Sequence, residues 1–321
     1  MNTRSRMRVF AGVAPAGLAV GVLAGCAGSG DEGDNGDGVT ITWWHNGTSG
    51  PLPAVWEEAH AEFEEAHPGA TVEQTRYQNE ELQRTLIPNA LAAGDPPDLF
   101  QVWPGGELRD QVKNGYLQPL DDAIADTISS VGATVNPWQV DGKTYGIPFT
   151  FGIEGFWYNT DLFEQAGAEV PTTFDELVDT VGALRDAGIT PIPVGAGDGW
   201  PAAHWWYQFA LKSCSPETLA AAETEFDFSD PCFVEAGEQL QEFLGVEPFQ
   251  DGFLGTPAQQ GAGSSAGMVA NGQAAMELMG HWNAGTIGGL TPDQKVPEFL
   301  GWFPMPGIAG AAGDPTAALG G

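Results

Sequence analysis

Residues 39–77 run VTITWWHNGTSGPLPAVWEEAHAEFEEAHPGATVEQTRY, and this stretch decides the fold class. It opens with a β-branched and aromatic run, Val39 to Trp44, which predicts a strand. Apolar side chains then recur at helical spacing from Leu52 to Ala66, and the Pro68–Gly69 pair ends the predicted helix. Residues 71–77 alternate as a second strand does. A strand, a helix and a strand in succession form the unit from which parallel sheets with covering helices are built.

The same alternation continues downstream. Residues 82–91 predict a helix that Pro88 bends or shortens, and residues 98–103 predict a short buried strand. Residues 108–112 indicate a brief helix that ends near Gly115. We therefore expect an α/β fold with a largely parallel sheet and helices on both faces.

The second half of the chain carries local signals of the same kind. Val140–Tyr145 predicts a hairpin with Asp–Gly as its turn, and Thr173 with Glu176 forms a capping box that starts a helix. The other predicted elements are extended segments at 151–158, 189–195 and 274–279 and a helix that begins at Asp230–Pro231.

The first 38 residues predict export and membrane anchoring. Three arginines precede an apolar run, which closes with Leu-Ala-Gly before Cys26. This pattern predicts a lipoprotein signal peptide over residues 1–25, with Cys26 as the acylated first residue of the mature chain. An ordinary signal peptide that contains a Cys is one alternative. A transmembrane helix is the other, although the run is short and Pro15 interrupts it. Residues 26–38 comprise the acylated Cys and an acidic, flexible linker.

The amino-acid composition limits the classes of ligand and partner that this chain can bind. The chain has 43 acidic and 11 basic residues and a formal net charge of −32, which would repel phosphates and excludes nucleic-acid binding. Solvated helix faces explain most of this charge, and a salty habitat is a second interpretation. Cys214 and Cys232 are predicted to form a disulfide outside the cell, with two separate buried thiols as the alternative. No Cys/His cluster has zinc spacing, so we expect no metal site and no cofactor.

Aromatic residues gather just past the predicted strands, where open α/β sheets bind ligands. The apolar faces of a sugar ring stack on aromatic rings, and its hydroxyls need the hydrogen bonds that Asn, His, Glu and backbone amides supply. We expect Trp103, Trp205 and Trp282 to stack on sugar rings. The full set of candidate ligand-binding residues, none of them catalytic, is Trp44, His45, Asn46, Trp103, Gly105, Gly106, Phe149, Glu154, Trp200, His204, Trp205, His281 and Trp282.

At these residues the chain resembles a known family, the extracellular solute-binding lipoproteins of ABC carbohydrate importers, which includes maltose-binding protein. The resemblance covers nearly all of residues 39–307. It is carried, in family order, by FEEAHPGATVE, ALAAGDPPDLFQVWPGGELRDQVKNGYLQPLDD, VDGKTYGIPFTFGIEGFWYNTDLFEQAG, TFDELVDTVGALRDAGITPIPVG, NGQAAMELMGHW and FPMPG. Within the family, the segments WPGG and GWPAAHWW are most similar to xylobiose and short-oligosaccharide binders of actinobacteria.

The resemblance implies a periplasmic-binding-protein-like fold of two α/β lobes, with a hinge and an interlobe cleft that closes on sugar. The lobes are expected at residues 39–150 and 151–321, with the first crossover at 148–159. Family members then cross back after the stretch matching 300–306, so we expect this fold to be truncated at the C-terminus and both lobes to be incomplete.

The function implied is capture of a short neutral oligosaccharide, xylobiose-like or similar, and its delivery to the permease subunits of an ABC importer. We expect a monomer at the extracellular face of the cytoplasmic membrane, lipid-anchored through Cys26. A secreted glycoside hydrolase is an alternative that needs a carboxylate pair, for which Glu107, Asp110, Glu154 and Glu277 are available, but no serine nucleophile elbow is present. Binding of another solute, such as a peptide or a metal chelate, is the third possibility.

Overall fold

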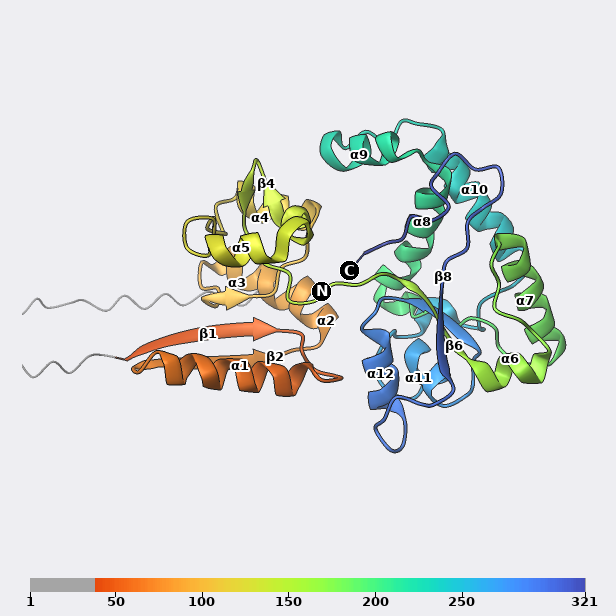
Figure 1. Ribbon diagram of the computed structural model, residues 1–321, viewed down its shortest axis with the longest axis horizontal. Helices are drawn as coiled ribbons and strands as arrows, with labels where there is room; N and C mark the ends of the chain where they lie inside the picture. Colours follow the sequence, from red (N-terminus) through yellow and green to blue (C-terminus); the bar gives the residue numbers. More distant parts are fainter. Residues whose placement is uncertain (1–37, 321) are drawn as a thin grey trace, which may run out of the picture. The chain divides into compact units, whose positions relative to one another are not determined.

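The computed structural model describes residues 38–320. The signal peptide, Cys26 and residues 26–37 of the linker lie outside the described residues. The first sheet contains β1 (Val39–His45), β2 (Ala70–Arg76) and β3 (Leu99–Phe100) in the order β2–β1–β3. Both pairings are parallel, which confirms the prediction for this part of the chain (Figure 1).

Helices cover both faces of this sheet. Neighbouring tryptophans of β1 point to opposite faces, so each face presents an apolar side chain to a helix. Trp43 meets Trp56 of α1 (Leu52–Ala66), with ring centroids 5.0 Å apart. Trp44 packs against a cluster that includes Leu82 and Ile87 from the helical run on the other face. That run comprises α2 (Asn79–Glu81), the π-helical η1 (Leu82–Leu86) and α3 (Ile87–Ala93).

The π-helical turn lies directly before Pro88, which lacks an N–H and would crowd the carbonyl four residues earlier in a regular helix. Pro88 therefore alters the helical geometry, as expected, without ending the helix. The chain continues through α4 (Gly106–Lys113), α5 (Ala125–Val131) and the 3₁₀ segment η2 (Gly132–Trp138). The predicted hairpin is confirmed as β4 (Gln139–Val140) and β5 (Lys143–Thr144). Asp141 and Gly142 at its turn have φ values of 51° and 74°, as a type I′ turn requires.

The second sheet differs from the expectation of a largely parallel arrangement. Its strands β6 (Gly155–Asn159), β7 (Met276–Met279) and β8 (Leu300–Pro304) have the order β7–β6–β8, and both pairings are antiparallel. The strand predicted at residues 189–195 forms only two isolated parallel bridges, from Thr190 to Ala274 and from Ile192 to Phe249. Pro191 and Pro193 lack the N–H groups that a continuous ladder needs, which explains why no regular strand forms there.

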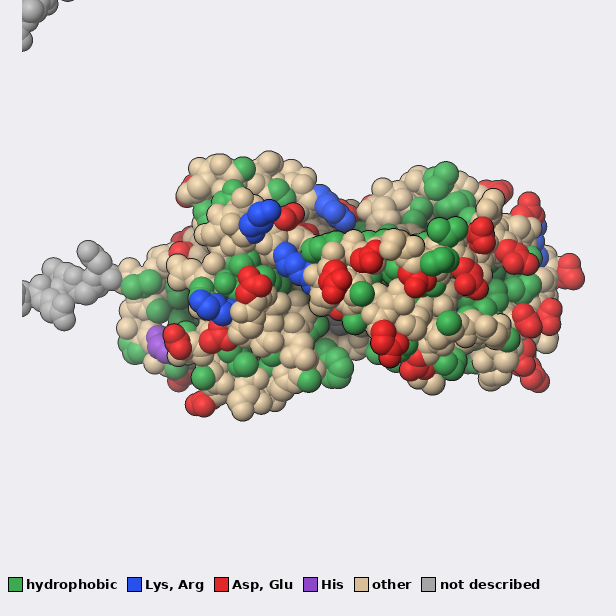
Figure 2. Space-filling view, turned by 90° about the horizontal axis from the view of Figure 1, so that it is seen from above, with side chains coloured by type: hydrophobic (Ala, Val, Ile, Leu, Met, Phe, Trp, Pro, Cys, Tyr) green, Lys and Arg blue, Asp and Glu red, His purple; other side chains and the backbone are tan. Residues whose placement is uncertain are grey.

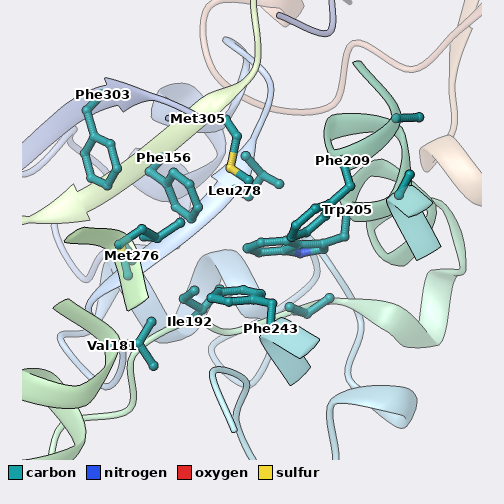
Figure 3. Packing of buried hydrophobic residues seen from close by; sticks show 14 of the residues in the cluster. Phe156, Val181, Ile192, Trp205, Phe209, Phe243, Met276, Leu278, Phe303 and Met305 are labelled. Atoms are coloured by element: carbon teal, nitrogen blue, oxygen red, sulfur yellow. The ribbon is translucent and has the colours of Figure 1, made fainter. Parts of the chain in front are cut away.

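The main hydrophobic core lies on one face of this sheet. Phe156, Met276 and Leu278 point from the strands toward side chains of the flanking helices, and Trp205 lies among them (Figure 3). On the opposite face, Trp157 packs against Val269 and Ile287. The helices of this part are α6 (Thr160–Ala166), α7 (Phe174–Asp186), α8 (Trp200–Ser213), α9 (Pro216–Glu225), α10 (Cys232–Leu244), α11 (Ser265–Ala270) and α12 (Asn283–Leu290), with short 3₁₀ turns η3 (Ala196–Asp198) and η4 (Phe253–Gly255).

Two local predictions in this region are confirmed. Thr173 and Glu176 form the reciprocal capping box at the start of α7. Cys214 and Cys232 form a disulfide with a Cα–Cα distance of 5.2 Å, which joins the end of α8 to the start of α10. The acidic composition corresponds to carboxylates dispersed over the visible surface, with few basic side chains among them (Figure 2).

Candidate functional site

The N-terminal turn of α8 brings two of the predicted site residues together. Gly199 precedes the helix with φ of 82°, and Pro201 occupies its first turn, where a missing N–H does no harm. Trp200 and His204 are four residues apart and so lie on one face of the helix, with ring centroids 5.0 Å apart. Tyr207 extends the same face, with its ring 5.9 Å from that of His204.

Two more predicted residues reach this face from the turn between β7 and α12. The ring of Trp282 lies 6.2 Å from that of Trp200, and the ring of His281 lies 5.4 Å from that of Trp282. We call Trp200, His204, His281 and Trp282 the aromatic cluster. All four side chains are partly exposed, so the cluster combines aromatic faces with access from solvent.

His281 has the chemistry of a hydroxyl-binding group. Its Nε2 lies 2.8 Å from Oγ1 of Thr150, whereas its Nδ1 is buried and has no protein partner. Burial lowers the pKa of His281, which keeps the ring neutral at pH 7. A neutral imidazole has one donor and one acceptor nitrogen. Because Nδ1 is buried, a sugar hydroxyl could bond only Nε2, in place of or beside the Thr150 hydroxyl.

A buried carboxylate stands behind the cluster. Glu154 is 1% exposed, and its Oε1 lies 2.5 Å from Nδ1 of His204. The two atoms are in direct contact but lack the alignment of a hydrogen bond. Nε2 of Gln208 donates to Oε2 of Glu154 over 3.4 Å. Glu154 therefore contacts His204 from the interior and offers no surface to a ligand.

Carboxylates also lie beside Trp200. Its Nε1 donates to Oε1 of Glu80 at 2.8 Å, and Gln260 donates to the other oxygen of Glu80 at 3.4 Å. Burial, and secondarily the nearby charge of Glu80, raise the pKa of Asp198. Within residues 38–320, no lysine or arginine side chain forms a hydrogen bond or ion pair with these groups. The charge around Trp200 is therefore predominantly negative.

The predicted residues around β1 form a separate group. His45 is 2% exposed, its Nε2 lies 3.1 Å from Gln74, and its Nδ1 accepts from the Gly47 N–H at 3.0 Å. Both nitrogens are thus occupied, and burial lowers the pKa of the ring. Asn46 donates to Oδ1 of Asn79 at 2.8 Å. Phe149 is 46% exposed, with its ring 5.2 Å from that of Trp56.

Other predicted residues have packing roles or remain open. Trp44 and Trp103 pack on the cluster of Leu82, Ile87 and Leu91. Side chains added at Gly105 or Gly106 would meet no atom within 4 Å, so this backbone stays open to approach. The φ of 93° by itself requires glycine at position 105.

Trp205 does not join the aromatic cluster. It is 2% exposed and stacks on Phe243 at 5.5 Å inside the core (Figure 3). It points away from Trp200 and His204 because it follows His204 by one position, which is a rotation of about 100° around the helix. We therefore leave Trp205 out of the proposed sugar site.

The sequence analysis missed Thr150, Tyr207, Gln208 and Glu80 as parts of this site. Helical spacing from Trp200 and His204 points to Tyr207 and Gln208, and this signal was present in the sequence. Thr150 precedes Glu154 by four positions in an extended segment, so alternation places it on the same side. Glu80 lies 120 residues from Trp200 in the sequence, and no local signal connects the two.

Away from the aromatic cluster, the described residues form two surface cavities and no metal-binding group. No group of three or more His, Cys, Asp or Glu side chains in residues 38–320 is arranged to hold a metal ion. Within the same range, no helix combines the length and apolar character needed to span a bilayer. A surface cavity of about 470 Å³ lies beside residues 291–299, and a second of about 410 Å³ lies beside residues 167–183. Neither includes a member of the aromatic cluster.

Comparison with known proteins places the chain and its fold in a family. The profile of the family described as "Bacterial extracellular solute-binding protein" matches residues 46–321. The chain belongs to this family. A curated relative, the multiple sugar-binding protein of Streptococcus mutans, is 25% identical over 298 residues, which cover 91% of this chain and 68% of the relative. An ABC transporter extracellular-binding protein of Pyrococcus horikoshii is 29% identical over 251 residues, which cover 77% of this chain and 56% of that protein.

Solved structures of family members share the architecture. One, from work on xylan utilization by the thermophilic bacterium Caldanaerobius polysaccharolyticus, has a TM-score of 0.79 at 27% identity, covering 88% of this chain and 71% of that one. A chitin oligosaccharide binding protein has a TM-score of 0.74 at 27% identity, with 89% and 71% covered. The periplasmic solute-binding fold is therefore confirmed. The family is described by solute binding, and the second of these structures is named a binding protein, which favours binding over the hydrolase alternative.

This chain spans just over half the length of the P. horikoshii relative and about seven-tenths of the matched solved structures. The lobe boundary between residues 150 and 151 stays a prediction. So does the role of each cluster residue in binding.

Proposed function

We propose that this protein is the extracellular sugar-binding component of an ABC importer and that the aromatic cluster holds a short neutral oligosaccharide. The observation that carries this proposal is the convergence of Trp200, His204, His281 and Trp282 on one partly exposed face. The sugar-binding and oligosaccharide-binding relatives support the choice of ligand class. Trp282 and Trp200 would stack on the apolar faces of the rings, and His204 and His281 would bond hydroxyl groups.

The charges favour a neutral ligand over an acidic one. Glu80, Glu154 and Asp198 surround the Trp200 side of the cluster without a lysine or arginine partner among the described residues. A uronic acid or a phosphorylated sugar would bring a further negative charge into this partly buried region, where repulsion is weakly screened. A xylobiose-like or similarly small uncharged oligosaccharide avoids that repulsion.

The proposal includes the cellular setting. Acylation of Cys26 would anchor the mature chain at the extracellular face of the cytoplasmic membrane, and the linker up to residue 38 would let it reorient toward a permease. The acidic surface would keep the anchored protein soluble as a monomer. Bound sugar would then be delivered to the permease subunits of the importer.

Calorimetric titration with neutral di- and trisaccharides, including xylobiose and chitobiose, tests the proposal. We expect binding without turnover, and Trp282→Ala should weaken it roughly thirtyfold or more because a central aromatic anchor is worth about 2 kcal/mol. The matched control is Trp206→Ala on the same helix, whose ring stacks on Phe233 and meets Tyr207 edge-on but pairs with none of the four cluster residues. This control should lower the melting temperature but keep the affinity. Normal binding by Trp282→Ala would remove the assigned site, and hydrolysis of the sugar would favour the enzyme alternative.

A further inference from the structure

We propose that Glu154 is a positioning residue that fixes the ring of His204 within the aromatic cluster. It ties this ring to residues 149–154, which are part of the predicted crossover at 148–159 and are called the crossover segment below. This inference rests on the proposed sugar-binding function and deepens it. Glu154 is 1% exposed, so a sugar cannot touch its carboxylate. Any effect of Glu154 on binding must therefore pass through its neighbours.

The crossover segment has two different faces. Phe149, Phe151 and Ile153 are 46%, 73% and 45% exposed. The alternate residues face the cluster: Thr150 contacts Nε2 of His281 at 2.8 Å, and Glu154 contacts Nδ1 of His204 at 2.5 Å. This period of two is that of an extended chain. One short segment thus holds both histidines of the cluster.

Gly152, between these two contacts, shows how closely the segment approaches. A Cβ atom at Gly152 would lie only 2.4 Å from the His281 ring, so a side chain there is sterically excluded. The backbone of the segment is also fixed on its far side. The N–H of Glu154 donates to the carbonyl of Leu319 at 2.8 Å, and Ile153 forms an antiparallel bridge with Gly320.

Glu154 therefore links the crossover segment to helix α8. Its backbone belongs to the paired crossover segment, and its side chain reaches α8 at His204 and Gln208. His204 in turn lies against Trp200. Any displacement of the His204 ring by a bound sugar acts on the Glu154 carboxylate, and movement of the crossover segment acts on the ring. The carboxylate both orients His204 and couples the cluster to the chain segment between the two sheets.

The isosteric variant Glu154→Gln tests this role because it removes the charge and keeps the shape. The matched control is Glu107→Gln, a half-buried carboxylate of α4 that bonds Gln83 and not the cluster. In sugar-free protein, the NMR signals of the His204 ring protons depend on the Trp200 ring current. They should shift in Glu154→Gln and stay unchanged in Glu107→Gln. This measurement needs no ligand, so failure to find a sugar would leave it intact.

Affinity provides the second readout. Glu154→Gln should weaken sugar binding about tenfold, the effect of about 1.4 kcal/mol, because the His204 ring loses the contact that orients it. In a His204→Gln background the same change should have less than about a twofold effect, because Glu154 acts through that ring. If Glu154→Gln fails to fold, Glu154→Asp replaces it, since it keeps the charge and withdraws it by one methylene. Unshifted His204 signals, or losses that multiply in the double variant, would overturn the inference. Absence of sugar binding by the wild type would instead refute the proposed function.

Discussion

Glu277 provides a stringent test of the buried electrostatics of the second sheet. It lies on β7 between Met276 and Leu278, which point into the main core, so its own side chain points to the other face. It is 1% exposed, and its Oε2 accepts a hydrogen bond from Nδ2 of Asn283 at 2.8 Å. Oε1 of Glu277 and Oδ1 of Asn283 accept no well-aligned hydrogen bond, and the nearby Ser265 hydroxyl donates to the Ala258 carbonyl instead. Burial raises the pKa of Glu277 from 4.5 to about 7.

The direction of the pH effect follows from this increase. Below pH 4.5 the carboxyl is protonated in both folded and unfolded chains and affects stability little. Between pH 4.5 and about 7 the unfolded chain loses the proton while the folded chain retains it, so the free energy of unfolding decreases as the pH rises. Each pKa unit is worth about 1.4 kcal/mol, so the full loss above pH 7 is about 3 kcal/mol.

Glu277→Gln removes this ionisation and keeps the side-chain shape. The amide oxygen can still accept from Asn283, and the new NH₂ group can donate where Glu277 could not. We expect the variant to match the wild type near pH 4.5 and to exceed it by about 3 kcal/mol at pH 8, a rise in melting temperature of roughly 5–10 °C. The control is Glu169→Gln, which removes an exposed carboxylate.

Thermal unfolding of the three proteins from pH 4.5 to 8 measures the effect. A difference between Glu277→Gln and wild type that is constant with pH would refute the reasoning, because it would show that Glu277 does not titrate differently in the folded chain. A wild type that is more stable than the variant at pH 8 would show that the ionised carboxylate has partners that offset its burial.

Two further predictions concern covalent chemistry. In urea unfolding, the double variant Cys214→Ser/Cys232→Ser should have a free energy of unfolding roughly 3 kcal/mol lower than the wild type, because the disulfide closes a loop with a sequence separation of 18. Equal stability of the two proteins would show that the bond does not restrict the unfolded state. Cys26→Ala should release the protein into the medium or leave its precursor uncleaved, as cell fractionation would detect, and normal processing with membrane retention would contradict the lipoprotein assignment.

Local patterns in the sequence were sufficient to predict much of the fold. The period-two and helical spacings in residues 39–77 predicted β1, α1 and β2, because the alternation of apolar side chains determines which face each element buries. The Thr173 capping box and the Asp141–Gly142 turn were equally predictable. Both depend on hydrogen bonds and dihedral angles within a few residues.

The pairing within the second sheet was decided only by tertiary structure. β6 pairs with β7 and β8, whose residues follow it by more than 100 positions, and nothing in the apolar pattern of β6 specifies an antiparallel partner. At residues 189–195 the apolar pattern favoured a strand, and the two prolines prevented a continuous ladder.

For the candidate site too, the sequence predicted part of the residue set and the tertiary structure decided the rest. Residue type and position after predicted strands were enough to select Trp200, His204, His281 and Trp282, because sugar recognition requires aromatic faces and neutral hydrogen-bonding groups. They also selected Trp205, which the sequence cannot distinguish from its neighbours on α8. Only the rotation of α8 against the sheet decided that Trp205 packs in the core while Trp200 and His204 face outward. That rotation accompanies the packing of Trp205 between Phe156 of β6 and Phe243 of α10, which is a property of the assembled core and not of any local stretch of sequence.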